Sequence, residues 1–355
     1  MWAGRGTAAL LILLAAVLPA GCTRTVTGQA RGGEPAPGVD SLFHGELLDY
    51  GQKLTEDEKT TLKYARALRG VDPCGFVANL KEFGDPAQFV GDFQACTASV
   101  KIAGAPGLTA VDYQYFLQDT AGSGEAFRVG DVPVYDLKDA CEYQVPLMLE
   151  RLPGAPKSAA LQPVLSVSLY DVMSEDTPDP DCRLSREVVT AIAKQLPSGL
   201  QPRSALSAYP IKLAERDPCE ILREYPGQAR KVSVDLLGDP FGCDFTLQGS
   251  DIDYSLNLLS SGGDLPAEYY EQSERDGVKY FQNDDPNSDV GCHAVALVGD
   301  PLYPKDIGGG ATQADSDPYY PAITVGAFSG EVSADCGQMR QILDKAVRLF
   351  ANSAR

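Results

Sequence analysis

Cysteine is the residue whose number and spacing carry most of the chemistry in this 355-residue chain, which contains nine of them. Cys22 stands alone near the N-terminus. The other eight form two groups of four with similar spacing: 22, 45 and 41 positions separate Cys74, Cys96, Cys141 and Cys182, and 24, 49 and 44 separate Cys219, Cys243, Cys292 and Cys336. Thiols in such groups form disulfides, bind metals or act as nucleophiles. The residues around the cysteines indicate which of these three roles applies.

The residues around the cysteines repeat as well. The tripeptide Asp-Pro-Cys occurs at 72–74 and again at 217–219. The fourth cysteine of each group starts a helical pattern, CRLSREVVTAIAKQL in the first and CGQMRQILDKAVRLF in the second. Self-similarity at a fixed period is the signature of a duplicated unit. The sequence therefore predicts a tandem duplication.

An even number of cysteines in an exported chain predicts disulfides. Four cysteines allow three pairings per repeat, and the sequence does not decide rigorously among them. We favour first-to-second and third-to-fourth, because each bond would then pin one helix to a sheet: Cys74–Cys96, Cys141–Cys182, Cys219–Cys243 and Cys292–Cys336. A zinc site is disfavoured because the chain has no CxxC pair. A reactive thiol at the helix start, Cys74 or Cys219, is disfavoured by the even count.

The first 21 residues have the pattern of a signal peptide. Arg5 supplies a positive charge, and an uncharged apolar run of eleven residues follows at 8–18. A membrane-spanning helix needs about 20 residues, so this run is too short to span and suits a cleaved export signal.

Cys22 directly follows the small residues Ala20 and Gly21, an arrangement that looks like a bacterial lipobox. We expect cleavage before Cys22 and attachment of diacylglycerol, with acyl chains such as palmitate, to its sulfur. One departure is Pro19, where the third residue before the cysteine is usually Leu; an ordinary signal with an incidental cysteine is the alternative. Residues 22–41 are rich in Gly, Pro and polar residues and predict a flexible tether. The expected location is the outer, extracytoplasmic face of the cell membrane, held by the lipid.

Composition excludes several functions. With 30 basic and 49 acidic residues the formal charge is −19, which disfavours nucleic-acid binding. The motifs GxSxG, SxxK, HExxH and GxxxxGK[ST] are missing from the sequence, so we predict no catalytic residues and no cofactor. A hydrolase that uses a pair of carboxylates stays open as an alternative, but the sequence does not single out two of the 49.

The best metal candidate is a loop at 283–291, where Asp285, Asn287 and Asp289 alternate as calcium ligands do. The glycine comes one place late, Pro286 interrupts, and Ala296 stands where an EF-hand has Glu. We therefore predict a polar turn and no metal. We predict the same for the first-repeat stretch that contains Asp176, Asp179 and Asp181. Only two histidines are present, and His293 is expected to be a buried strand residue. Several aromatic residues could line a cleft but are expected in the core and sheets: Tyr113, Tyr115, Phe116, Tyr269, Tyr270, Tyr319 and Tyr320.

The elements that position these residues follow a common order. Thr55 to Glu58 fit a capping box and predict a helix that ends at Gly70. Asp72 and Asp217 are expected to cap a helix in each repeat, with proline in the first position. Strands are expected at 96–104, 108–118, 141–149 and 164–172, and again at 243–249, 252–260, 292–298 and 322–330. Each repeat thus reads as a helix, four to six antiparallel strands and a helix. The predicted class is α+β, with a first repeat at 42–200, which includes the N-terminal helix, and a second at 206–355.

These motifs resemble those of a family of actinobacterial, mycobacterial-type secreted lipoproteins that is known as a domain of unknown function. The resemblance rests on the lipobox, on the start Cys-x-x-x-Val-x-Gly-x-Ala (Cys22, Val26, Gly28 and Ala30), and on the DPC and cysteine pattern of both repeats. The usual member has one such unit, whereas this chain has two. More distantly, the layout is similar to the extracellular sensor domains of mycobacterial serine/threonine kinases, which also carry two disulfides. The family has no established catalytic residues, so the resemblance implies none here.

The sequence therefore predicts a non-enzymatic, lipid-anchored envelope protein that binds a small ligand or an envelope protein. Its anchor makes the membrane one partner, and nucleic acid is not expected to be another. A carboxylate-pair hydrolase acting on envelope glycans or lipids is one alternative, and a purely structural scaffold lipoprotein is the other.

Overall fold

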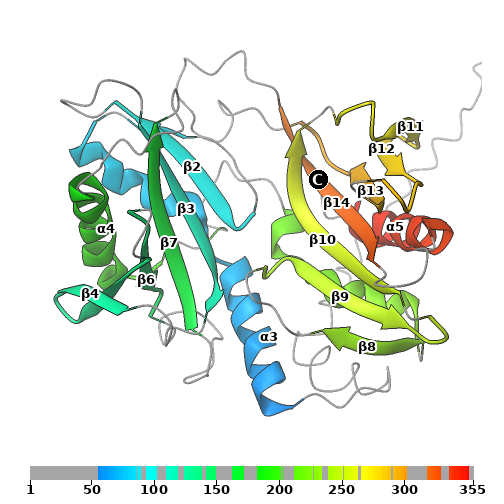
Figure 1. The fold of residues 1–355 in the computed structure, drawn as a ribbon, viewed down its shortest axis with the longest axis horizontal. Coiled ribbons are helices and arrows are strands. Elements are labelled where there is room, and N and C mark those ends of the chain that lie inside the picture. The colour runs from blue at the N-terminus through cyan, green and yellow to red at the C-terminus, as the bar shows by residue number, and fades with distance from the viewer. Residues whose placement is uncertain are drawn as a thin grey trace, which may run out of the picture. The chain divides into compact units, whose positions relative to one another are not determined.

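The protein is α+β, with two tandem disulfide-bonded domains that each contain one seven-stranded antiparallel sheet (Figure 1). The computed structural model describes residues 55–84, 86–88, 93–101, 109–118, 124–137, 141–148, 162–171, 182–200, 203, 212–226, 228–233, 239–250, 252–262, 265–288, 291–301, 318–328 and 336–351. The predicted signal peptide, Cys22, the tether and His44 lie outside the described residues.

The two sheets have the same topology. The first runs in the order β1-β2-β3-β7-β6-β5-β4, and the second in the corresponding order β8-β9-β10-β14-β13-β12-β11. The strands of the first are β1 (Pro86–Gln88), β2 (Ala95–Val100), β3 (Thr109–Gln118), β4 (Gly124–Val129), β5 (Val132–Asp136), β6 (Tyr143–Pro146) and β7 (Gln162–Asp171). Those of the second are β8 (Ala229–Ser233), β9 (Gly242–Leu247), β10 (Asp253–Gly262), β11 (Glu271–Arg275), β12 (Val278–Asn283), β13 (Cys292–Leu297) and β14 (Tyr319–Phe328). Each sheet takes strands from one repeat alone; the domain limits 42–200 and 206–355 stay predictions.

The last helix of each repeat shows the duplication side chain by side chain. These helices are α4 (Arg183–Gln195) and α5 (Cys336–Phe350), which contact the strands of their own sheets (Figure 1). When Cys182 is aligned with Cys336, the buried positions coincide: Ser185 with Met339, Val188 with Ile342, Val189 with Leu343, Ile192 with Ala346, Ala193 with Val347, and Leu196 with Phe350. The same stripe therefore faces the core in both repeats.

The DPC motifs start helices, as predicted, but these are 3₁₀-helices, η2 (Pro73–Glu82) and η8 (Pro218–Glu224). The Asp72 and Asp217 side chains accept hydrogen bonds from the backbone N–H groups of Cys74 and Cys219, at 3.1 and 2.9 Å. The sequence missed the tighter winding because an apolar pattern over seven to ten residues hardly separates 3.0 from 3.6 residues per turn.

Four disulfides join the cysteines in the favoured pairing, Cys74–Cys96, Cys141–Cys182, Cys219–Cys243 and Cys292–Cys336. Each ties a helix start to the sheet: Cys74 and Cys219 lie at the second position of η2 and η8, and Cys182 and Cys336 lie at the starts of α4 and α5. Cys141 stands two positions before β6, whereas the prediction placed it on the strand.

Each sheet has seven strands, where four to six were expected. The additional strands are edges and hairpins that carry little hydrophobic pattern. All five residues of β11 are exposed, and β1 has only three residues. Edge strands without an apolar face give no period-two signal, so propensity alone could not find them.

The N-terminal helix α3 (Glu56–Arg69) is present where the capping box predicts it. Among the described residues, no helix is long and apolar enough to cross a membrane.

Both sheets belong to one compact unit, Val39–Arg355, and several contacts join the repeats. Arg69, the last residue of α3, forms a buried ion pair of 2.8 Å with Asp217 of the second DPC motif. The rings of Phe93 and Phe241 meet edge to face, with centroids 5.5 Å apart. Arg203 comes from the segment predicted to be a break between repeats, yet it is among the largest fully buried side chains.

Candidate functional site

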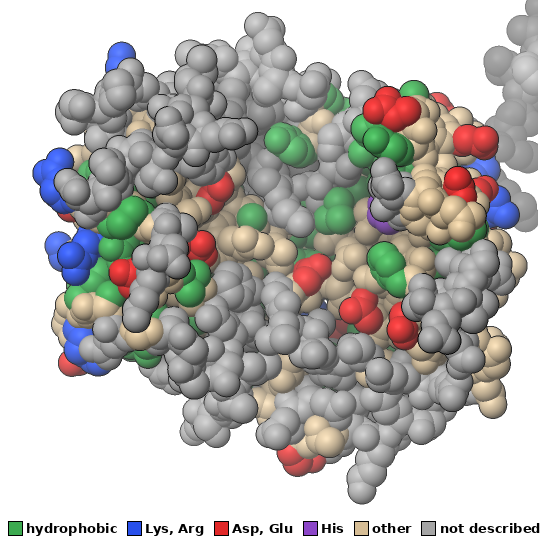
Figure 2. Space-filling model, viewed as in Figure 1, with side chains coloured by type: hydrophobic (Ala, Val, Ile, Leu, Met, Phe, Trp, Pro, Cys, Tyr) green, Lys and Arg blue, Asp and Glu red, His purple; other side chains and the backbone are tan. Residues whose placement is uncertain are grey.

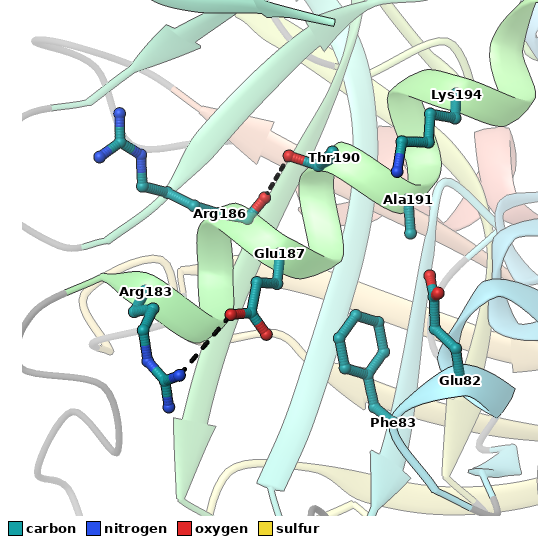
Figure 3. A pocket seen from close by; sticks show the side chains of 8 residues that line it. All are labelled: Glu82, Phe83, Arg183, Arg186, Glu187, Thr190, Ala191 and Lys194. Carbon is teal, nitrogen blue, oxygen red and sulfur yellow. Dashed lines mark hydrogen bonds and ion pairs between the residues drawn. The ribbon is translucent and has the colours of Figure 1, made fainter.

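A groove of about 600 Å³ lies between α4 and the end of η2 in the first repeat. Glu82 and Phe83 line it from η2, and six residues line it from α4: Arg183, Arg186, Glu187, Thr190, Ala191 and Lys194 (Figure 3). Because residues three and four apart share one face of a helix, this α4 set forms a stripe that faces away from the buried one. The amphipathic pattern of α4 thus positions the groove residues.

The groove is rich in charge. Arg183 and Glu187 form an ion pair of 3.8 Å whose side chains are 82% and 52% exposed, so water screens the attraction and the pair is loose. The Arg186 guanidinium lies 5.0 Å from the centroid of the Phe127 ring. Figure 2 shows blue side chains gathered over the part of the surface where α4 lies, on a protein whose formal charge is −19. The groove is therefore charged differently from the chain as a whole.

The second repeat has a different side chain at the helix position that aligns with Ala191. Lys345 of α5 aligns with Ala191 of α4, and its Nζ lies 3.7 Å from the centroid of the Tyr225 ring. The same Nζ donates a hydrogen bond of 2.9 Å to the carbonyl oxygen of Glu224. Tyr225 is the C-cap of η8, and counted from Cys219 and Cys74 it aligns with the buried Leu80; Phe83 is the C-cap of η2 because that helix is three residues longer. Lys345 therefore covers the aromatic ring that its own repeat offers, whereas Ala191 is too short to do so.

The Tyr225 ring under Lys345 is deeply placed. Burial is the main cause that raises the pKa of Tyr225 to about 12, against a smaller lowering by a hydrogen bond with Gln338. At neutral pH the phenol is thus uncharged, and the ring face attracts the ammonium through its quadrupole.

A second hollow, of about 530 Å³, lies in the second repeat between the β11–β12 turn and the end of α5. The Arg275 side chain in this hollow has two partners: it pairs with Asp344 at 2.9 Å and lies 4.1 Å from the centroid of the Tyr280 ring. Asp344 aligns with Thr190 of the groove in the first repeat. A ligand in this hollow would therefore have to compete with Asp344 and Tyr280 for the Arg275 guanidinium.

His293 lies on β13, as predicted, and its Nδ1 forms a hydrogen bond of 2.9 Å with the hydroxyl of Tyr270. Burial lowers the pKa of His293 below its ordinary 6.5. The side chain is half-buried, where the sequence led us to expect a buried residue.

This pKa shift predicts a pH dependence of stability. As the pH falls from about 7 to 5, the unfolded chain binds the proton on residue 293 before the folded chain does, so the free energy of unfolding should fall. The variant His293→Gln should lose less stability over that window and match the wild-type pH dependence above it. Urea unfolding at several pH values measures both; equal pH dependence in the two proteins throughout would contradict the lowered pKa of the half-buried histidine.

The loop proposed as a weak calcium candidate forms a turn. The backbone N–H of Asp285 donates to the side chain of Asn283, and the N–H of Asn287 donates to the Asp285 carboxylate, at 2.8 and 2.9 Å. Asp289 lies outside the described residues, as do Asp176, Asp179 and Asp181. Among the residues that the structure describes, no three His, Cys, Asp or Glu side chains are grouped closely enough to hold a metal ion.

The aromatic candidates do not gather at one place. Tyr113 and Tyr115 lie in the core, and the Tyr115 hydroxyl donates to the carbonyl oxygen of Val71 at 2.9 Å. Tyr270 contacts His293, Tyr269 is exposed, and Tyr319 and Tyr320 are half-buried on β14. The side chain of Phe116 is not among those described.

Sequence reasoning did not single out the groove. A signal was present, because alignment of the two helices that follow the fourth cysteines places Ala191 opposite Lys345. The alignment of the helices could not show that η2 packs beside α4, because this is a tertiary contact between residues about a hundred positions apart in the chain.

Comparisons with known proteins add little. No family model matches the chain, and no curated protein matches it. Among solved structures, the crystal structure of the di-domain ARO/CYC StfQ from the steffimycin biosynthetic pathway covers 81% of this chain and 95% of that chain, with 9% identity and a TM-score of 0.17. A likeness at that score carries no argument about fold or function.

Proposed function

We propose that this chain is an exported, non-enzymatic lipoprotein, anchored through Cys22 at the outer face of the cell membrane, which binds a ligand or a protein partner in the groove between α4 and η2. The anchor rests on the signal pattern and the small residues before Cys22. We also propose that it belongs with the actinobacterial lipoproteins that its motifs resemble. The disulfides that hold the helices on the sheets suit such a role, because a pre-organised groove loses little conformational entropy when it binds a ligand.

The observation that carries the binding role is the difference between the repeats. One fold occurs twice, and in both copies the face of the last helix that carries Ala191 or Lys345 lies beside the 3₁₀-helix, which is three residues longer in the first repeat. Lys345 covers the ring of Tyr225, whereas Ala191 leaves a groove beside Phe83. A duplicated unit whose last helix borders a groove at Ala191 in one copy, and carries a lysine folded onto the protein at the aligned position of the other, favours use of the groove.

The hydrolase alternative finds weaker support. Glu82 and Glu187 do line one groove, but both are exposed. The acid of a glycosidase needs a raised pKa, which it owes to apolar surroundings. The scaffold alternative predicts an empty groove in the cell, so occupancy separates it from the binding role.

Purification of the native protein from its host membranes tests this proposal. We expect intact mass to show a mature chain that starts at Cys22 and carries a diacylglycerol, and mass spectrometry of the denatured sample to find a molecule or peptide that copurifies with it. An unmodified chain that retains residues 1–21 would contradict the anchor. A protein that is acylated but carries nothing above a mock purification would favour the scaffold.

A further inference from the structure

We propose that the groove of the first repeat binds an acidic segment of a partner protein, whose carboxylates pair with Arg186 and Lys194. The inference rests on the proposed function, since it names what the groove takes. Its own observations are the charges that line the groove and the contacts that the aligned helix makes in the second repeat.

The charges of the groove favour a negative ligand. The groove is lined by three cations, Arg183, Arg186 and Lys194, and by two carboxylates, Glu82 and Glu187, on a chain whose formal charge is −19. Glu187 already pairs with Arg183 at 3.8 Å. Within the described part of the chain, neither Arg186 nor Lys194 forms an ion pair, and Figure 3 shows none between Lys194 and Glu82. Two cations are therefore left for a ligand, against one carboxylate.

The second repeat shows which partner an arginine at this helix position takes. Arg340 of α5 aligns with Arg186 when Cys336 is aligned with Cys182, and its guanidinium forms an ion pair with the carboxylate of Asp284. The Arg186 guanidinium has no such partner among the described residues and lies 5.0 Å from the centroid of the Phe127 ring. A guanidinium over a ring keeps its charge and its free N–H groups for a carboxylate. The first repeat thus has the arginine of this pair without the acid.

The spacing of the groove residues sets the pattern of the ligand. Arg186 and Lys194 are two turns apart on α4, about 12 Å along its axis, and Phe83 faces the stretch of helix between them (Figure 3). An extended segment covers that length in about four residues, since it rises about 3.3 Å per residue. Its first, third and fifth side chains share one face. The expected pattern is therefore an acidic residue, an apolar residue two positions on, and a second acidic residue two positions after that.

A carboxylate on a polypeptide fits the groove better than a phosphate or a membrane surface. Glu82 and Glu187 are exposed beside the cations, so a phosphate, with nearly two charges, meets more repulsion than a carboxylate with one. An anionic membrane would repel the acidic chain over a wide area, whereas a peptide places single charges beside single cations. Phe83 and Ala191 are half-buried and offer an apolar side chain a surface that an inorganic anion cannot use.

Nuclear magnetic resonance on the labelled mature lipoprotein tests the inference with three acetylated, amidated peptides of the sequence Gly-X-Gly-Leu-Gly-X-Gly, where X is aspartate, asparagine or lysine. We expect the aspartate peptide to shift the amide signals of Arg186, Ala191 and Lys194. The asparagine peptide should bind about threefold to tenfold more weakly, because two exposed ion pairs together contribute modestly. Raising the salt concentration to about 0.5 M should reduce that difference, since salt screens exposed charges.

Matched variants locate the charges that bind the peptide. Arg186→Gln and Lys194→Gln should each weaken binding of the aspartate peptide about twofold to fivefold, whereas Glu82→Gln should strengthen it by removing the opposing carboxylate. Lys212→Gln removes one exposed cation outside the groove and should leave binding unchanged. The double reversal Arg186→Glu/Lys194→Glu should prefer the lysine peptide. Ala191→Lys should abolish binding although it adds a positive charge, because its side chain occupies the place of the leucine.

Equal binding of the aspartate and asparagine peptides, preference of the wild type for the lysine peptide, or no binding of any peptide would overturn the acidic assignment. Larger shifts with inorganic phosphate than with the aspartate peptide at the same concentration would overturn it too. The proposed function fails separately. A copurifying molecule that has no carboxylate, and is lost in Ala191→Lys, would keep the groove as a binding site while the acidic assignment falls.

Discussion

Replacing Arg203 with methionine is expected to lower the free energy of unfolding by about 3–5 kcal/mol, because it removes the hydrogen bonds that a buried, charged side chain donates in the core. The Arg203 side chain is 2% exposed. It donates to the carbonyl oxygens of Arg69, Val71 and Phe93 and to the hydroxyl of Tyr115, at 3.2, 3.0, 2.7 and 2.9 Å. Methionine keeps much of the volume and removes every one of these bonds, so the variant isolates the polar contribution.

Urea unfolding of the wild type and of Arg203→Met measures this loss. Arg183→Met is the matched control, because Arg183 is 82% exposed, and it should change stability by no more than about 0.5 kcal/mol. A loss below about 1 kcal/mol for Arg203→Met would mean that the guanidinium is not held as the structure shows.

The second large effect is expected at Arg69. Its guanidinium pairs with the Asp217 carboxylate at 2.8 Å and donates to the Pro240 carbonyl at 2.8 Å, and the two charged side chains are only 5% and 4% exposed. Arg69→Met should cost about 3–5 kcal/mol, because it leaves the Asp217 charge buried without its partner.

A double-mutant cycle separates the ion pair from other effects of these substitutions. Asp217→Asn removes the charge but keeps an oxygen that can accept from the N–H of Cys219. The double variant Arg69→Met/Asp217→Asn should therefore be more stable than Arg69→Met alone, with a coupling energy of at least about 1 kcal/mol. Additive losses in chemical denaturation would show that the two residues do not interact.

These two sites give the DPC motif a second role besides starting a 3₁₀-helix. Asp217 in the second repeat pairs with Arg69, which comes before the first sheet. Asp72 in the first repeat lies near Arg203, which comes after α4: burial raises the pKa of Asp72, and the Arg203 charge partly lowers it. Each motif aspartate is thus matched to an arginine from outside its own α+β unit.

The sequence was most informative where the chemistry is local. Asp caps and prolines at the first helical position act over a few residues, so the helix starts could be anticipated. The disulfides join cysteines 22 to 44 positions apart, and the sequence favoured their pairing without deciding it. The strands of the sheet centre followed from β-branched and aromatic runs. The polar strand β11 gave no such signal, since all of its residues are exposed.

Long-range effects were missed for a physical reason. Arg203 stands among Pro and Ser residues that indicate a linker, and only the folded chain brings it to carbonyls near residues 70 and 93. Nor does α4 by itself show that its outward stripe meets Phe83. The groove depends on one short side chain, Ala191, whose meaning appears when the two copies are compared.

Recovery of the copurifying molecule from the wild type and from two lysine variants tests the central claim most directly. Ala191→Lys places a long side chain in the groove, and Ser198→Lys adds the same side chain at an exposed position outside it. The wild type, Ala191→Lys and Ser198→Lys would be purified in parallel from host membranes, and their bound molecules quantified by mass spectrometry. We expect the wild type and Ser198→Lys to carry the same molecule in similar yield, and folded, acylated Ala191→Lys to have lost most of it. Equal recovery from all three proteins would contradict the assignment of binding to the groove between α4 and η2.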